Sequence, residues 1–467
     1  MQFQRPYDPA VSFRNSQGEA ARGTLTSVQR RSLVMEIYNP YSIVQVSEVL
    51  SDLTIRAGDQ ALYKGKAVVV GMLNTGLMAV VSVALIDEWS DLNAVRGNVD
   101  QVRLEAQRFV QSWEDRFRVR HTYQVAISEF RAFLAETARW VDQADLVESL
   151  PKGPDGRLTD EVFEAMAQPL MVKGKAFLDR LEGEAAGLSE EEGPLHRAYA
   201  QAALHPLVLR APFVWRTFSK PLGYAGDYEM VNQILADPRQ GQSTYFQIVN
   251  AMFLRAAVSQ AHRNRIDILV KFLGQAVDNA ERENRTVRIL NVGCGPAIEV
   301  QRLIASGRDL SRLHFTLVDF SRETLDYTRA RIDEALQRHG RTLAVEYVQE
   351  SVHDLLKRPA RSEPPAPGQG EDLVYCAGLF DYLSDKVCSR LVRYFLFRCN
   401  PGARLMVTNV HAQNPERFGM EHLLEWHLIY RDEAQMRAML DEVDGPVTLY
   451  TDDTGVNLFA EFGARSP

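Results

Sequence analysis

The sequence predicts an α/β protein with a Rossmann-like, mostly parallel sheet that ends in an antiparallel hairpin, preceded by a helical region and a small N-terminal β-barrel. Three observations predict this fold class. An apolar run at residues 289–292 leads into a glycine turn at 293–295 and then into a helical pattern. Further apolar runs alternate with helical patterns, as in parallel sheets with crossover helices. Near the carboxy terminus, residues 447–450 and 457–462 flank turn residues 452–455.

The length, charge and cysteine content of the chain exclude several function classes. A chain of 467 residues is long enough for two or three domains with a large buried core. Its net charge of −8, without a basic stripe, predicts no nucleic-acid partner. The cysteines form neither a CxxC pair nor a cluster with histidines, so we expect reduced thiols, no metal site and a cytoplasmic protein. They are Cys294, Cys376, Cys388 and Cys399. The first residues lack the apolar core of a signal peptide, which agrees with a cytoplasmic location.

Residues 1–90 are predicted to form the small β-barrel. Short strand-like runs are separated by turn residues, and they lie at 33–38, 43–46, 67–73 and 77–86. The apolar stretch 67–86 is long enough to imitate a membrane span, but Asn74, Thr75 and Gly76 interrupt it with turn chemistry. We therefore expect two strands joined by a tight turn and no integral membrane segment.

The predicted barrel is vaguely similar to PilZ-type barrels, which bind cyclic dinucleotides. The arginine signature of that family is represented only by Arg30 and Arg31, and its Asp/Asn-x-Ser-x-x-Gly motif is not found in good form. Cyclic-dinucleotide binding therefore stays open beside a second role, in which a degenerate barrel serves interaction or homodimerisation through the N-terminal regions.

Residues 91–244 are predicted to be a helical region. Apolar side chains recur there at helical spacing and predict core-facing stripes. These side chains are Phe109, Val110, Trp113, Phe117, Ile127, Phe130, Phe133 and Leu134. Residues 151–156 are predicted to be a linker, because they combine prolines and glycines. Near the end of the region, Gly223 and Gly226 permit positive φ, and Asp227 can cap a helix that starts at Tyr228.

Residues 245–467 are predicted to form the Rossmann-like domain. A long helical pattern from about residue 245 leads into the first strand, and helical patterns fill the intervals after it. The predicted parallel strands lie at 289–292, 315–318, 344–348, 372–375 and 404–409.

The turn at Gly293 and Gly295 predicts a site for an adenosine-containing cofactor at the edge of the sheet. Glycines let the backbone turn sharply and lie close to a ligand. Asp319 follows the second strand, where a carboxylate suits a ribose diol, although a helix N-cap is the alternative. A dinucleotide fingerprint fails because Ile298 stands at its sixth position, and no P-loop Lys-Ser/Thr follows the glycines. Pro296 lacks an N–H, which suits a cofactor without phosphates better than a phosphate cradle.

Residues 291–297, Asn-Val-Gly-Cys-Gly-Pro-Ala, resemble motif I of class I S-adenosylmethionine-dependent methyltransferases. The usual motif has an acid where Asn291 stands and a third glycine where Ala297 stands. The antiparallel hairpin at the end of the chain resembles the end of the same fold. The resemblance implies a class I methyltransferase domain with S-adenosylmethionine as its cofactor.

The same resemblance implies which residues contact the cofactor. Asn291 would lie near the methionine part, Asp319 would accept the ribose hydroxyls, and Phe320 would cover the adenine ring. The other implied positions follow the first, third and fourth strands, and they are Gly293, Cys294, Gly295, Ser351, Val352, Cys376, Ala377 and Gly378.

Three further segments are similar to one bacterial methyltransferase family, that of 3-hydroxypalmitic acid methyl ester biosynthesis. They are residues 220–228, 372–383 and 425–431, and the similarity covers roughly residues 200–467. It implies a fatty-acid methyl ester signal, as in quorum sensing, as the product.

Four residues of these segments are the catalytic candidates, namely Tyr224, His427, Tyr430 and Arg431. Tyr224 would fold over the cofactor as a lid. Residues 425–431 are predicted to be helical, so that Trp426 and Tyr430 share a face with His427 and Arg431 beside it. Arg431 would clamp a substrate carboxylate. The structural alternatives are a surface salt bridge for Arg431 and core packing for Trp426.

The sequence thus predicts a methyltransferase that esterifies a 3-hydroxy fatty acid or a similar small acid. A carboxylate is ionised at pH 7 and needs no general base. An amine or hydroxyl acceptor would need one, and His411, His427 or Asp381 would be the candidates. Two alternatives stay open: N- or O-methylation of another metabolite, and a non-catalytic regulatory protein that binds S-adenosylmethionine.

Overall fold

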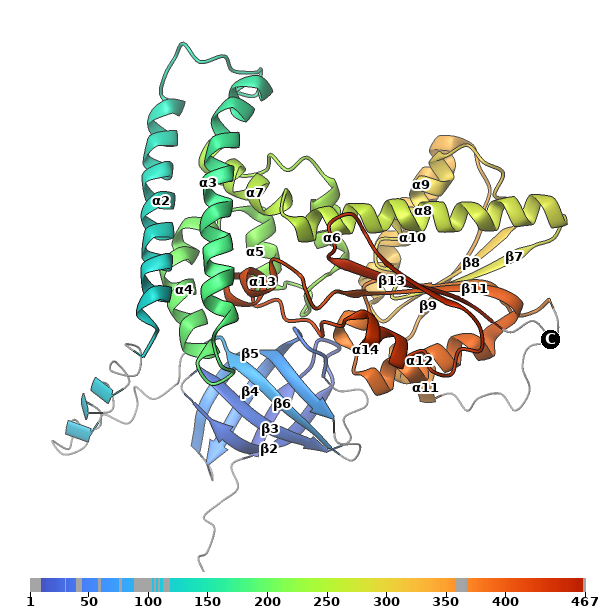
Figure 1. The fold of residues 1–467 in the computed structure, drawn as a ribbon, viewed down its shortest axis with the longest axis horizontal. Helices are drawn as coiled ribbons and strands as arrows, with labels where there is room; N and C mark the ends of the chain where they lie inside the picture. Colours follow the sequence, from blue (N-terminus) through green and yellow to red (C-terminus); the bar gives the residue numbers. More distant parts are fainter. Residues whose placement is uncertain are drawn as a thin grey trace, which may run out of the picture. The chain divides into compact units, whose positions relative to one another are not determined.

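The chain folds into two compact units (Figure 1). The computed structural model describes residues 10–357 except 30, 39–43, 58–59, 75–77, 88–102, 105, 108–109 and 112–117, together with 366 and 368–464. The first unit comprises Met1–Gly226, Ala236–Ala256 and Pro415–His427, and the second comprises Asp227–Leu235, Ala257–Asn414 and Leu428–Pro467. The units cut across the predicted segments 1–90, 91–244 and 245–467, because two later stretches return to the first unit. The division into three segments stays a prediction.

A closed antiparallel barrel opens the first unit, as predicted. Its strands are β1 (Ala10–Arg14), β2 (Ala20–Val28), β3 (Ser32–Tyr38), β4 (Val49–Ala57), β5 (Gln60–Asn74) and β6 (Met78–Leu85). They pair in the order β1-β2-β3-β6-β5-β4 around a core of apolar side chains such as Val11, Met35 and Val81. The stretch 67–86 supplies parts of β5 and β6. None of the helices in the described ranges combines the length and apolar character that a bilayer crossing needs.

One predicted strand of the barrel is wrong. Residues 44–46 form an irregular segment and a turn, and residue 43 lies outside the described ranges. Strand β4 takes the place of that strand, and β1, β2 and β4 were not among the predicted strands. In the turn Ser47 has a φ of 67°, a left-handed backbone conformation that interrupts the extended chain just before β4.

Helices follow the barrel in the described part of the first unit. They are α2 (His121–Asp145), α3 (Asp160–Ala186), α4 (Gly193–Val208), α5 (Pro212–Ser219), α7 (Thr244–Leu254) and α13 (Arg417–Leu424). Ile127, Phe130 and Leu134 are buried on α2, as their spacing predicts. Val110 is 52% exposed, so its predicted place in a core-facing stripe is wrong. The other members of that stripe, Phe109, Trp113 and Phe117, lie outside the described residues.

The second unit contains a seven-stranded sheet in the order β12-β13-β11-β10-β7-β8-β9. Its strands are β7 (Val287–Val292), β8 (Leu313–Asp319), β9 (Ala344–Gln349), β10 (Glu371–Cys376), β11 (Cys399–Val410), β12 (Val447–Thr451) and β13 (Asn457–Gly463). Strands β7 to β11 run parallel, and β13 is antiparallel to both β11 and β12. Every predicted strand of this domain is present, and the predicted Rossmann-like class I methyltransferase fold with its terminal hairpin is confirmed.

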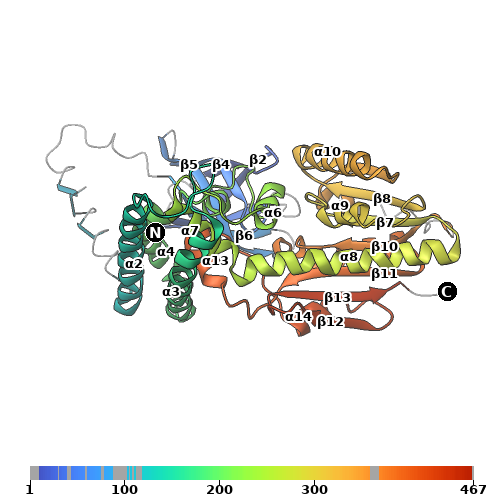
Figure 2. The same ribbon diagram turned by 90° about the horizontal axis from the view of Figure 1, so that it is seen from above.

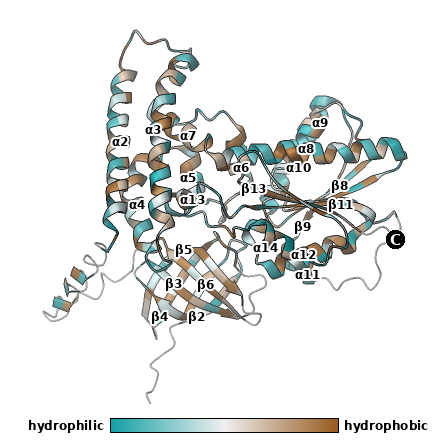
Figure 3. Cartoon of the chain, viewed as in Figure 1, coloured by the Kyte–Doolittle hydropathy of each residue, from teal (hydrophilic) through white to brown (hydrophobic). Residues whose placement is uncertain are grey.

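Helices cover both faces of this sheet (Figures 1 and 2). They are α6 (Tyr228–Leu235), α8 (Ala257–Glu283), α9 (Ile298–Ala305), α10 (Arg322–His339), α11 (Val352–Lys357), the 3₁₀ turn η2 (Phe380–Tyr382), α12 (Asp385–Arg398) and α14 (Glu433–Ala438). Because side chains alternate along a strand, Ile289 packs with α8, α9 and α10, whereas Leu290 packs with α11, α12 and α14. In Figure 3 the strands between these layers are largely hydrophobic, and α8 carries hydrophilic residues along much of its length.

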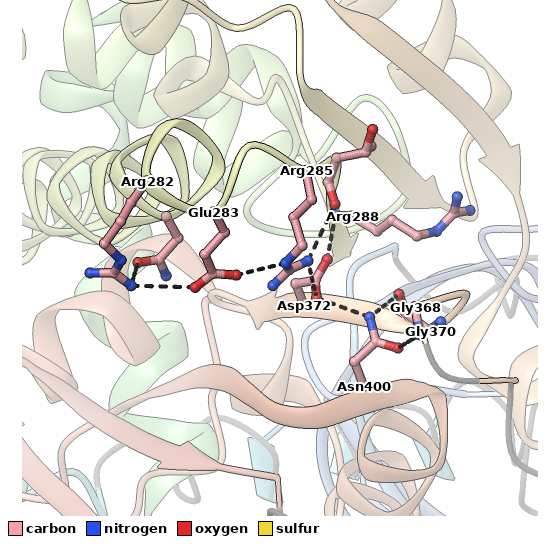
Figure 4. A network of polar contacts seen from close by, with 10 residues as sticks. Arg282, Glu283, Arg285, Arg288, Gly368, Gly370, Asp372 and Asn400 are labelled. Carbon is pink, nitrogen blue, oxygen red and sulfur yellow. Dashed lines mark hydrogen bonds and ion pairs between the residues drawn. The ribbon is translucent and has the colours of Figure 1, made fainter.

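A polar network ties the amino ends of the central strands together (Figure 4). The carboxylate of Asp372, at the start of β10, accepts hydrogen bonds from Arg285 Nη1 at 2.8 Å, Arg288 N at 2.9 Å and Asn400 Nδ2 at 2.9 Å. Asn400 also bonds the backbone of Gly370. Ligands of open α/β sheets bind at the opposite, carboxyl edge, so we assign this network to stability.

Candidate functional site

The backbone turns sharply at the carboxyl end of β7. Gly293 and Gly295 have φ values of 73° and 50°, which glycine adopts without steric cost. The amides of Gly293 and Cys294 donate to the carbonyl of Val318 on β8, at 2.9 and 3.1 Å, so the turn is held against the neighbouring strand. Ala297 also lies in the left-handed region, with a φ of 46°. Ala297 stands where motif I usually has its third glycine, and it therefore adopts a backbone conformation typical of glycine.

Asp319 lies at the carboxyl end of β8 beside this turn. Its side chain is buried and accepts hydrogen bonds from Gly295 N at 3.2 Å and Ser321 N at 2.9 Å. Burial raises the pKa of Asp319 to about 6, against the lowering effect of the backbone amides. The N-cap of α10 is Ser321, whose Oγ accepts from Thr324 N. The N-cap alternative for Asp319 is therefore wrong, and its carboxylate joins the ends of two adjacent strands.

A buried acid that the sequence analysis missed stands beneath the turn. Glu299, in the first turn of α9, accepts hydrogen bonds from Asn291 Nδ2 at 3.3 Å and from the Tyr375 hydroxyl at 2.7 Å. Burial raises the pKa of Glu299, and the Tyr375 hydrogen bond and the charge of Arg265 oppose that rise. Position 291, where motif I usually has an acid, thus holds an amide that reaches a carboxylate eight residues further on. A glutamate after a helix N-terminus is common, so its spacing carried no signal of this role.

The remaining predicted cofactor residues also follow carboxyl ends of strands. Ser351 lies between β9 and α11, and its Oγ donates to the Asp354 carboxylate in the first turn of α11 at 2.6 Å. Cys376 ends β10 fully buried, and burial raises the pKa of its thiol well above the ordinary range, so the thiol stays protonated. Gly378, with a φ of 86°, donates its N–H to Thr408 Oγ1 at 3.0 Å. Phe320, Val352 and Ala377 are the half-buried neighbours of these positions. One edge of the sheet thus gathers all eleven predicted positions, and their contact with a cofactor stays a prediction.

The predicted helix over residues 425–431 is wrong. Helix α13 ends at Leu424, because Glu425 takes a left-handed conformation with a φ of 48°. Residues 425–430 are irregular, and Arg431 forms an isolated bridge with His411. The predicted shared helix face of Trp426, His427 and Tyr430 therefore does not exist. Trp426 is buried, in agreement with its core-packing alternative.

Arg431 is a fully partnered, buried cation. Its Nε donates to Asp385 Oδ1 at 2.8 Å and its Nη1 to the carbonyl of Phe380 at 2.8 Å. The other N–H groups bond Asn409 Oδ1, the carbonyl of Leu383 and Asp385. Four of its five N–H donors thus make hydrogen bonds, and Nη2 also lies 2.8 Å from Asp385 in an ion pair, all within the second unit. The surface salt bridge alternative is wrong because the side chain is 1% exposed, and its partners within the protein argue against a substrate clamp.

The histidine candidates for a general base are engaged elsewhere. His427 belongs to the first unit, where its Nε2 lies 3.0 Å from the Glu425 carboxylate. Burial lowers the pKa of His427, although the Glu425 hydrogen bond acts in the opposite direction. His411 lies 3.2 Å from Glu433 in the second unit.

Asp381, the third candidate base, accepts a hydrogen bond from Val410 N at 2.6 Å. Burial raises its pKa, and the charge of Arg265 opposes the rise.

Groups of three or more His, Cys, Asp or Glu side chains that could hold a metal ion do not occur among the described residues.

Residues 223–227, Gly-Tyr-Ala-Gly-Asp, span the sequence boundary between the two units. Gly223 and Gly226 have positive φ values of 87° and 77°. The Gly223 carbonyl accepts from Val49 N of the barrel at 2.7 Å, within the first unit. Asp227 Oδ1 accepts from Met230 N at 2.8 Å and caps α6, as predicted. Tyr224 belongs to the first unit, and its lid role stays a prediction.

The sequence matches no protein-family model and no curated protein. A possible exported protein from Bordetella parapertussis is 17% identical, with a TM-score of 0.40 over 68% of this chain and 100% of that chain. Magnesium protoporphyrin IX methyltransferase from Synechocystis, with SAH bound, is 13% identical, with a TM-score of 0.34 over 59% and 99%. The N-methyltransferase NodS from Bradyrhizobium japonicum is 15% identical, with a TM-score of 0.28 over 44% and 98%. Because these TM-scores are low, the strand order of this chain carries the fold assignment.

Proposed function

We propose that the protein is an S-adenosylmethionine-dependent methyltransferase that esterifies a small acid. The observation that carries the proposal is the carboxyl edge of β7 and β8, where the turn at Gly293 and Gly295 meets the buried carboxylate of Asp319. This edge belongs to a sheet in which the antiparallel strand β13 lies between β11 and β12. A carboxylate with two oxygens matches a ribose diol. Pro296 in the turn has no N–H, which suits a cofactor without phosphates.

The acceptor in this proposal is the carboxylate of a 3-hydroxy fatty acid or of a similar small acid. A carboxylate oxygen attacks the sulfonium methyl, an O–CH₃ bond forms, and the C–S electron pair returns to sulfur to give S-adenosylhomocysteine. The nucleophile is already ionised at neutral pH. The engagement of His411, His427 and Asp381 in other hydrogen bonds supports an acceptor that needs no base. Catalysis then rests on alignment of the two reactants and on exclusion of water.

Two measurements test the proposal in sequence. Calorimetry with S-adenosylmethionine tests cofactor binding. If the wild-type chain does not bind the cofactor, the whole proposal is overturned. Incubation with methyl-labelled cofactor and a panel of hydroxy acids, amines and phenols tests the acceptor. We expect a labelled product that releases methanol in alkali, as carboxyl methyl esters do. A base-stable product would instead indicate methylation of an amine or of a hydroxyl group. Cofactor binding without turnover would indicate a regulatory role.

The cytoplasmic location and homodimerisation through the N-terminal regions belong to the same proposal. So does an S-adenosylmethionine contact for each of the eleven positions along the sheet edge. The proposal gives no catalytic role to Arg431.

A further inference from the structure

Arg265 is a cation at the carboxyl edge of the sheet that has no direct partner among the described residues. It lies in the third turn of α8 and is partly buried. A Cβ placed on Gly378, just past the end of β10, would lie 3.0 Å from Arg265 Nη1 and 3.2 Å from Nη2. The guanidinium therefore lies directly against the backbone of Gly378. Among the described residues, Arg265 makes no hydrogen bond or ion pair.

Other buried arginines of the chain do have partners. Arg431 makes four hydrogen bonds and an ion pair, and Arg239 bonds Gln247, Asp160 and the carbonyl of Leu158. Around Arg265, the charges of Asp381 and Glu299 act at longer range than an ion pair. Burial lowers the pKa of Arg265, so its charge is held there at a cost. A partly buried guanidinium whose N–H groups lack acceptors among the described residues is suited to an anionic ligand.

We propose that Arg265 binds a carboxylate at the carboxyl edge of β7 and β10, bidentately and against Gly378. The inference rests on the proposed function, which supplies two such groups: the methionine carboxylate of the cofactor and the carboxylate of the acceptor. The planar fork of arginine matches either carboxylate. The glycine at 378 leaves room for the guanidinium, because a side chain there would press on Nη1.

Calorimetry on the wild-type protein tests whether Arg265 binds the methionine carboxylate of the cofactor. If Arg265 holds the methionine carboxylate, decarboxylated S-adenosylmethionine binds at least tenfold more weakly than S-adenosylmethionine. Arg265→Gln then weakens S-adenosylmethionine by a similar factor and leaves the decarboxylated ligand unchanged. Arg265→Lys, which keeps the charge without the fork, gives an intermediate affinity. The matched control is Arg302→Gln on α9, where an exposed ion pair with Asp267 is removed.

Steady-state kinetics with 3-hydroxypalmitate test whether Arg265 binds the carboxylate of the acceptor instead. If Arg265 holds the acceptor, Arg265→Gln raises the KM for 3-hydroxypalmitate at least tenfold while cofactor affinity stays unchanged. 3-Hydroxypalmitamide then competes poorly with the acid on the wild-type protein. The inference is overturned if wild-type protein discriminates neither ligand pair and Arg265→Gln binds both as wild type does. That result, with cofactor binding intact, leaves the proposed function standing, whereas a wild-type chain that binds no cofactor removes both.

Discussion

At the scale of single residues, Asp319 offers a test that separates binding from folding. Its pKa is raised from 3.8 to about 6, so the folded state favours the protonated form. The stability that this group contributes is full below about pH 3.8 and is lost as the pH rises through 6. The ionised carboxylate therefore costs the cofactor-free protein up to about 3 kcal/mol at pH 8.

We expect Asp319→Asn to weaken S-adenosylmethionine on the order of 10- to 100-fold at pH 8 without lowering the free energy of unfolding. The loss of a charged acceptor for two hydroxyls gives this magnitude. The wild-type affinity should fall as the pH drops through 6, and that of the variant should stay flat. Calorimetry between pH 5 and 8, with urea unfolding at pH 8, measures both. A variant that binds normally but unfolds more easily would show that Asp319 is only structural.

Arg431 offers the opposite test, because its partners all lie within the protein. Arg431→Met removes a charged donor from Asn409 Oδ1 and from the carbonyls of Phe380 and Leu383 in a buried site. We expect the free energy of unfolding to fall by about 3–5 kcal/mol in urea titrations. Arg393→Gln, which removes an exposed ion pair with Glu442, should change it by less than about 1 kcal/mol. If Arg431→Met kept the free energy of unfolding of wild type but raised the KM for the acceptor, Arg431 would be the predicted substrate clamp after all.

At the scale of elements, the two edges of the sheet should behave differently on mutation. Asp372 binds together the amino ends of β7, β10 and β11, and its side chain is 11% exposed. We expect Asp372→Ala to lower the free energy of unfolding by about 2–4 kcal/mol, because three donors lose their acceptor. Cofactor affinity, measured well below the unfolding temperature, should stay within twofold of wild type. A large loss of affinity in a folded variant would contradict the assignment of this edge to stability.

At the scale of the whole molecule, S-adenosylmethionine should protect the second unit against opening. A ligand at 100 times its dissociation constant stabilises the state that binds it by about 2.7 kcal/mol. We expect hydrogen exchange to slow at residues 287–300 and 313–321, and to stay unchanged in barrel strands β1–β6. Mass spectrometry of peptides, with and without cofactor, measures this. Protection confined to the barrel would place the ligand elsewhere in the chain.

Much of the second unit could be predicted from the sequence because its signals are local. Apolar runs of four to six residues predicted each strand of the sheet, and the turn at Gly293 and Gly295 predicted where β7 ends. Residues 425–431 show the limit of such signals. Trp426 and Tyr430 have helical spacing, but the left-handed backbone of Glu425 ends the helix before them. Glu425 is held there by Arg197 at 3.5 Å and Gln201 at 2.7 Å, which lie more than 200 residues earlier in the chain.

The sequence by itself determined the fold class and the strand ends that form the candidate site. The tertiary structure alone decided which polar groups are engaged there. Glu299 accepts a hydrogen bond from Asn291, and Arg431 is bonded to its neighbours. Arg265 lies against Gly378, with no partner in the part of the chain that the structure describes. The physical reason is that secondary structure follows from local spacing and backbone preference. The pairing of a buried charge depends on which distant segments fold around it.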